Sequence, residues 1–217
     1  MSSTTRIIQL SRIASQGALG SVLIRLMIAI NDMALAHDAL RLWVEEQERS
    51  RKHRERGGKI YFVRLQISHI YEALSIVKEI RDSPALMKAI ERSGRRTQTA
   101  FEKLVHFIDS DEFEKVMGRI RNNLTFHYDP KTIGRALQTL LEKHPAALGS
   151  ISLGDDPLDW YCEPGDMVLD RAGVREVFKV SEGVDVREET DRIIMHLHGI
   201  AQAFGGVAAS LIWQNSR

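Results

Sequence analysis

The segment RIRNNLTFHYDP, residues 119–130, carries the side chains whose types and spacing could do chemistry. An imidazole such as that of His127 takes up or releases a proton near neutral pH. A guanidinium such as that of Arg121 presents a planar fork of N–H donors that matches phosphate oxygens. RNA carries its own nucleophile in the 2′-OH, so an acid–base group beside a phosphate-binding group could promote its cleavage.

A helix at residues 110–129 must position these side chains, and it must end before Pro130 because the residue before a proline disfavours helical geometry. At about 100° per residue, His127 falls inside the apolar stripe of this helix. Arg121 and Tyr128 lie at the edge of the stripe, and Asn122 points nearly the opposite way. The residues that form the stripe are Phe113, Val116, Met117, Ile120 and Leu124.

A purely structural interpretation of the same residues is open. A histidine at a helix end can bond the last carbonyls and interact favourably with the negative end of the helix dipole. Arg121 would then pair with Asp129 or with an acidic residue on a neighbouring helix, since a buried arginine without a partner is costly.

The spacing of Arg121, Asn122 and His127 resembles the signature of the HEPN superfamily. That signature is an arginine, a polar residue that is often asparagine, a spacer of four to six residues, and a histidine. The family is an all-α helical bundle with the motif on a late helix, and many members are metal-independent ribonucleases of toxin–antitoxin and defence systems. Others have lost activity and only bind. Tyr128 departs from members that place a tyrosine one residue later, so no role is carried over to it.

The resemblance implies that Arg121 and His127 are catalytic, that Asn122 supports them, and that no cofactor or metal is needed. Members commonly dimerise so that two motifs face one cleft. One motif supplies one imidazole, so separate acid and base roles require a second copy of the chain. The expected partners are therefore RNA, a second copy of the chain and an antitoxin protein. The expected location is the cytoplasm, without membrane association.

A basic run, RSRKHRERGGK at residues 49–59, is the second candidate feature. It could grip a phosphate backbone in a salt-dependent and sequence-indifferent way. The alternative is a solvated connection between two helices, and the Gly57-Gly58 pair predicts a turn in either case. The candidate RNA-binding residues are Arg49, Arg51, Lys52, Arg54, Arg56 and Lys59.

Composition fits one folded domain and excludes a general polycation. The 217 residues include 43% hydrophobic and 27% charged residues, and the formal net charge is +1. The single cysteine, Cys162, cannot form an internal disulfide. The longest apolar runs are interrupted or shorter than about 20 residues, so no membrane-spanning segment is expected. Residues 1–18 are read as a polar tail, although their lack of acidic residues also resembles an organelle transit peptide.

Helical periodicity dominates the chain. Ser83-Pro84 predicts a capped helix start. Residues 146–184 are rich in turn residues and acidic side chains, which predicts an irregular insertion with a small hairpin and no metal site. The fold class is therefore all-α, one domain over residues 1–217, resembling a HEPN helical bundle. Helices are expected at residues 19–47, 60–80, 84–90, 97–108, 110–129, 131–143 and 186–215.

Three further patterns concern the last helix and the first. His196 and His198 are two residues apart on a helix, so they diverge and do not share a metal ion. Small residues at 201, 205 and 209 allow close approach to another helix. His37 falls on the apolar stripe of the first helix, which predicts a core histidine.

The function that these features favour is a metal-independent endoribonuclease of toxin or defence type. The alternatives are a non-catalytic helical module that binds RNA or protein, and an organelle-targeted helical protein in which the motif is coincidence.

Overall fold

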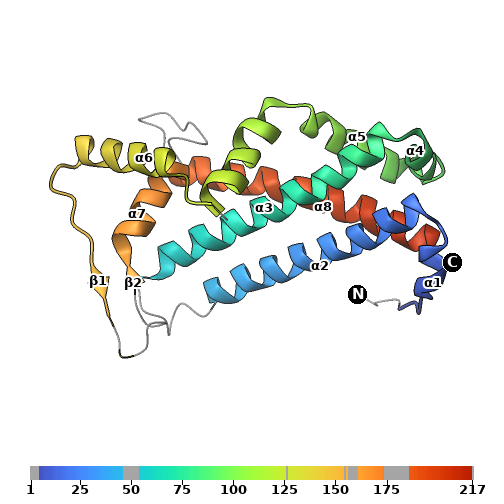
Figure 1. Cartoon of the computed structure of the whole chain (residues 1–217), viewed down its shortest axis with the longest axis horizontal. Coiled ribbons are helices and arrows are strands. Elements are labelled where there is room, and N and C mark those ends of the chain that lie inside the picture. The colour runs from blue at the N-terminus through green and yellow to red at the C-terminus, as the bar shows by residue number, and fades with distance from the viewer. Residues whose placement is uncertain are drawn as a thin grey trace.

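The computed structural model confirms the all-α fold class, with only one small two-stranded sheet. It describes residues 5–45, 54–125, 127–153, 155, 161–173 and 186–216. Three long helices, α2, α3 and α8, form the body of the molecule, and α6, α7 and the sheet gather at one end (Figure 1). The elements are α1 (Leu10–Ala14), α2 (Ala18–Glu45), α3 (Arg54–Asp82), α4 (Pro84–Glu91), α5 (Arg95–Ile108), η2 (Phe113–Gly118), η3 (Arg121–Thr125), α6 (Pro130–Lys143), β1 (Ile151–Ser152), β2 (Tyr161–Cys162), α7 (Glu163–Arg171) and α8 (Val186–Asn215).

Helix α3 is the central element, because α2, α5, α8 and the π-helical segments η2 and η3 all pack against it. Its apolar stripe supplies Leu74 and Val77, which are fully buried, as the helical spacing predicts. Leu23 and Leu26 of α2 and Phe204 of α8 are buried in the same core. The segment that carries Arg121 therefore rests on the most enclosed helix of the bundle.

Helix α2 carries apolar side chains on its exposed side as well as on its buried side, for example Leu35 and Leu26. Residues Ala18–Trp43, with a mean hydropathy of 1.6, are long and apolar enough to cross a membrane by length and composition, a test that core helices also pass. The sequence analysis expected every apolar run to be interrupted or shorter than the roughly 20 residues that span a membrane, and this expectation was wrong for α2. Two charged side chains within this stretch are paired with α3: Arg25 bonds Glu79, and Asp32 lies 3.9 Å from the His69 imidazole.

The N-terminal segment, predicted to be a polar tail, contains the short helix α1 and contacts the bundle at a few points, while most of its described side chains are exposed. Ile13 of α1 is only 1% exposed. The Arg6 guanidinium donates to the Trp213 carbonyl at 2.7 Å and lies 3.6 Å from the centre of the Trp213 ring. The Gln16 amide donates to the Asn215 carbonyl at 2.8 Å. These contacts fasten the start of the chain to the C-terminal end of α8.

The turn expected at Gly57-Gly58 is absent, because both glycines lie inside α3. A Cβ atom on Gly58 would lie 2.2 Å from Cε2 of Trp43 on α2. The missing side chain therefore lets the Trp43 ring pack against α3. Helical glycine costs only about 1 kcal/mol, which this packing can offset.

The expected insertion is partly regular. Ile151 pairs with Cys162 and Ser152 with Tyr161 in an antiparallel hairpin, as the turn residues predict. The prediction of non-helical structure was wrong for α7, which packs against α6 and α3. The rest of the predicted insertion beyond residue 173 lies outside the described residues.

Candidate active site

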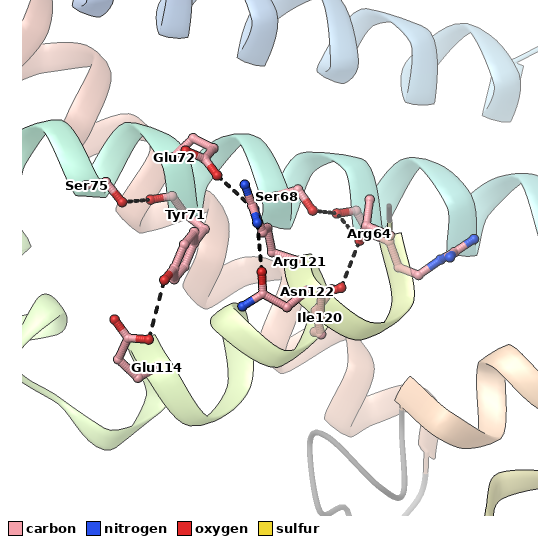
Figure 2. A network of polar contacts seen from close by, with 10 residues as sticks. Arg64, Ser68, Tyr71, Glu72, Ser75, Glu114, Ile120, Arg121 and Asn122 are labelled. Atoms are coloured by element: carbon pink, nitrogen blue, oxygen red, sulfur yellow. Dashed lines mark hydrogen bonds and ion pairs between the residues drawn. The ribbon is translucent and has the colours of Figure 1, made fainter. Parts of the chain in front are cut away.

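Arg121 is held at the surface of the bundle by two neighbours. Its Nε donates to Oε1 of Glu72 on α3 at 2.8 Å, and its Nη1 donates to Oδ1 of Asn122 at 2.8 Å. The Arg121 side chain remains 36% exposed and that of Glu72 54% exposed. Figure 2 shows the guanidinium between these two partners, with η3 lying along α3. Two contacts thus fix the guanidinium while part of it stays open to solvent.

The placement of Asn122 differs from the prediction that it points away from Arg121. The chain from residue 113 to 125 contains two π-helical segments, in which the backbone bonds run from i to i+5. This wider winding invalidates the assumed rotation of about 100° per residue. The structure therefore brings Arg121 and Asn122 into contact.

Arg64 of α3 braces the end of η3. Its Nη1 donates to the carbonyl of Leu124, and the Thr125 hydroxyl donates to the carbonyl of Arg64 at 3.3 Å. The same Thr125 hydroxyl donates to the Ile120 carbonyl at 3.1 Å. The Arg64 guanidinium extends away from that of Arg121 (Figure 2). The arginine thus holds the backbone immediately before the segment that carries His127.

The cation of Arg64 is enclosed. Arg64 is 9% exposed, and its Nε is buried without a hydrogen-bond partner among the described residues. Burial lowers the pKa of the guanidinium from its ordinary value, and the nearby Tyr128, Asp166 and Tyr61 partly oppose that effect. The carbonyls at the end of η3 compensate this charge, since the C-terminal end of a helix favours cations.

His127 lies outside the helix and is exposed, so the prediction that it continues the buried stripe was wrong. Segment η3 ends at Thr125, two residues earlier. The imidazole of His127 has no hydrogen-bond or ion-pair partner in the described part of the chain. The structural interpretation expected this imidazole to bond the last carbonyls of the helix, and it does not. The imidazole is open to any molecule that approaches this surface.

Asp129 fixes the far end of the segment. Its N–H donates to the Asn123 carbonyl at 3.1 Å, and its carboxylate accepts from the Thr132 N–H at 2.8 Å and the Thr132 hydroxyl at 2.6 Å. The hydroxyl and then the N–H of Thr132 lower the pKa of the Asp129 carboxyl. Asp129 is thus the N-cap of α6 rather than the partner of Arg121, and the segment carrying His127 is tied at both ends.

Replacing Arg64 with Met should loosen the end of η3 while the bundle stays folded. Loss of a charged donor to the Leu124 carbonyl should speed local opening, and hence amide exchange at residues 121–129, by about tenfold. Hydrogen–deuterium exchange measured by mass spectrometry tests this, with residues 95–108 of α5 as the internal control. Unchanged exchange at residues 121–129 would show that Arg64 does not hold this segment.

The sequence missed Glu72 and Arg64 as parts of the site. Arg64 sits three residues before the buried Ile67, at the edge of the α3 stripe, and a charge in that position is a detectable signal. Glu72 carries no such signal, because its partner is 49 residues away in sequence. The structural interpretation allowed Arg121 to pair with Asp129 or with an acid on a neighbouring helix, and the contact with Glu72 shows the second of these pairings.

Half of the candidate RNA-binding residues lie within a described helix. Arg54, Arg56 and Lys59 belong to α3, but their side chains lie outside the described atoms. Arg49, Arg51 and Lys52 lie outside the described residues altogether. Their role in RNA binding remains a prediction.

In the described part of the chain, no other histidine has a ring contact or hydrogen bond with His127. His196 contacts Glu112 at 3.6 Å and the Phe107 ring, whereas His198 faces His37 and Gln202, so the two diverge as predicted. Within the described ranges, no three His, Cys, Asp or Glu side chains converge as metal ligands. Comparisons of the chain with protein-family models, curated proteins and solved structures found no match.

Proposed function

We propose that this protein is a metal-independent endoribonuclease of the HEPN type, in which Arg121 and His127 carry the reaction. The observation that supports the proposal most is the orientation of Arg121 by Glu72 and Asn122, with its guanidinium still 36% exposed. His127, exposed on a segment tied at both ends, follows six residues later. RNA is a polymer and could not enter a closed pocket. The guanidinium of Arg121 and the imidazole of His127 are both exposed enough for RNA to reach them.

The reaction is a transesterification within RNA. The 2′-OH attacks the adjacent phosphorus, the bond to the 5′-oxygen breaks, and the products carry a 2′,3′-cyclic phosphate and a 5′-OH. His127 removes the 2′-OH proton or protonates the departing 5′-oxygen. A guanidinium has five N–H donors, and those of Arg121 not engaged by Glu72 and Asn122 face the negative charge that develops on the phosphate oxygens.

A dimer completes the catalytic pair. Each chain supplies one His127, so one imidazole acts as base and the His127 of a second copy acts as acid. The proposed assembly therefore brings Arg121 and His127 of two chains to one cleft. RNA and an antitoxin protein are the other proposed partners, and a bacterial cytoplasm is the proposed location.

A non-catalytic binding module is the second candidate, and one contact favours it. The Arg121–Glu72 pair is complete without a substrate and joins η3 to α3. Exposed pairs of this kind contribute about 0–1 kcal/mol to stability. The pair can therefore serve only to join η3 to α3, with a small gain in stability. Such a module would bind RNA or protein through the same surface and leave RNA intact.

Cleavage in the presence of a chelator separates these candidates. The wild-type protein, incubated with a single-stranded RNA in excess EDTA, should cut the RNA but not a DNA of the same sequence, which lacks the 2′-OH. Sedimentation at the assay concentration should give a dimer. RNA binding without cleavage would favour the second candidate, and a cleaving monomer would contradict the two-chain site.

A further inference from the structure

A cavity of about 490 Å³ lies between α2, α3 and α8, and none of its lining residues belongs to the candidate active site. Its volume is within the roughly 300–1,000 Å³ typical of small-molecule sites. The wall is mainly aliphatic, and Phe204 is its one phenyl ring among the described residues. On α2 the lining extends from Ile30 to Leu40, eleven residues that span about 15 Å along the helix axis. An aliphatic cavity of that length suits an unbranched hydrocarbon chain.

The polar side chains of the wall gather at one level of the bundle. Contacts of Asp32 with His69 and of Trp43 with Phe62 show that α2 and α3 run antiparallel, which sets His37 near the level of Gln66. The rings of His37 and His198 are 6.2 Å apart. Gln202 Nε2 lies 2.9 Å from Nε2 of His198. Two imidazoles and two amides therefore face the same part of the cavity.

Part of the rim of the cavity lies at this level. His37, His198 and Gln202 are exposed, so His37 is not the core histidine that its position on the stripe predicted. In contrast, Ile67, Ile70 and Phe204 line the cavity on the side of the core and are buried. No Asp, Glu, Lys or Arg lines the cavity in the described part of the chain. A polar part of the rim with N–H donors and no acidic side chain, above an aliphatic interior, matches an amphiphile with a hydrogen-bond-accepting head.

We infer that this cavity binds a single-chain fatty acid, with its carboxylate at His37, Gln66, His198 and Gln202 and its hydrocarbon chain between α2, α3 and α8. The imidazoles and amides donate hydrogen bonds to the carboxylate, and the bond is strengthened by the charge of the acceptor. The aliphatic chain displaces water from the apolar wall, which drives binding. Met33 and Met195 line the wall, and methionine adapts readily to chains of different length.

Titration of the full-length protein with cis-parinaric acid, a fatty acid that fluoresces in apolar surroundings, tests the site. The fluorescence should saturate at one molecule per chain, and palmitate should displace the probe. A Cβ on Gly205, which lines the cavity, meets no atom within 4 Å, so Gly205→Leu has room for a side chain that fills the space. This variant should bind at least about tenfold more weakly, the effect of excluding about two methylene groups from apolar contact. Ala201→Leu, from the same wall, should act likewise if Gly205→Leu does not fold.

The head group is tested separately. Combined His37→Ala and His198→Ala should weaken palmitate binding about tenfold, and hexadecanol, which lacks the carboxylate, should displace the probe about tenfold less effectively than palmitate. Equal displacement by palmitate and hexadecanol would overturn the assignment of the carboxylate.

A matched control excludes binding to the outer face of α2. Leu35 is 68% exposed and does not line the cavity, so Leu35→Ala should leave the affinity unchanged. Absence of saturable binding, or equal affinity of the wild type and both cavity-filling variants, would overturn the proposal. A loss in Leu35→Ala as large as that in Gly205→Leu would also overturn it. The fatty-acid site does not depend on ribonuclease activity, so either proposal can fail alone.

Discussion

His127→Ala should lower the single-turnover rate of RNA cleavage by about 10²–10⁴-fold, because it removes the proposed proton-transfer group. Arg121→Ala should lower it by about 10²–10³-fold, because it removes donors aimed at the developing phosphate charge. Both residues are at least partly exposed, so neither variant is expected to unfold. The measurement is the cleavage rate of each purified protein at saturating concentration, with the thermal midpoint recorded alongside.

Two matched control variants distinguish a loss of catalysis from the loss of a positive charge and from cleavage by a contaminating ribonuclease. His106 is an exposed histidine on α5, and Arg119 is an exposed arginine two residues before Arg121. His106→Ala and Arg119→Ala should cleave at the wild-type rate. If His127→Ala cleaves as fast as His106→Ala, the imidazole of residue 127 has no part in the reaction. A fall of equal size in Arg119→Ala and Arg121→Ala would indicate a loss of general RNA attraction.

Phe113→Ala should destabilise the protein by about 3–5 kcal/mol, the usual cost of truncating a buried phenylalanine. Phe113 is 2% exposed and lies at the start of η2. Its ring stacks on Tyr71 with the centres 4.9 Å apart, and it meets the edge of Phe107 at 6.4 Å. Removing it takes away the aromatic contacts that pack η2 on α3 and α5. The free energy of unfolding in urea, followed by circular dichroism, measures the effect.

Leu35→Ala is the control for this stability measurement. Leu35 is 68% exposed on α2, and surface truncations of this kind usually change the free energy of unfolding by no more than about 0.5 kcal/mol. A loss of less than about 1 kcal/mol in Phe113→Ala would contradict the packing described for η2, since even modest buried truncations exceed it.

The sequence predicted those elements whose signals are local. Ser83 accepts the Leu86 N–H at the start of α4, where Pro84 occupies the first turn, as the Ser-Pro pair predicted. Asp129 caps α6 before Pro130 in the same manner. The last helix spans the range that its periodicity predicted, residues 186–215. Capping residues and apolar periodicity are properties of neighbouring residues, so the sequence displays them.

The geometry of the candidate site could not be predicted, because it depends on distant partners and on an irregular helix. The π-helical turns change the direction of the side chains within them, which is why the predicted orientation of Asn122 was wrong. The predicted position of His127 was wrong because η3 ends at Thr125 and His127 lies outside it. Glu72 and Arg64 reach the site from α3 through tertiary packing. Gly58, expected in a turn, lies inside α3 and against Trp43 of α2. Long-range contacts outweighed local preference in each case.

Analysis of the RNA ends left by the wild-type protein tests the central claim most directly. If the 2′-OH is the nucleophile and His127 and Arg121 assist it, every cut made in EDTA leaves a 2′,3′-cyclic phosphate and a 5′-OH. Cuts that leave a 3′-OH and a 5′-phosphate would require an attacking water, and intact RNA would mean no reaction at all. Either result would contradict the assignment of Arg121 and His127 as a ribonuclease site.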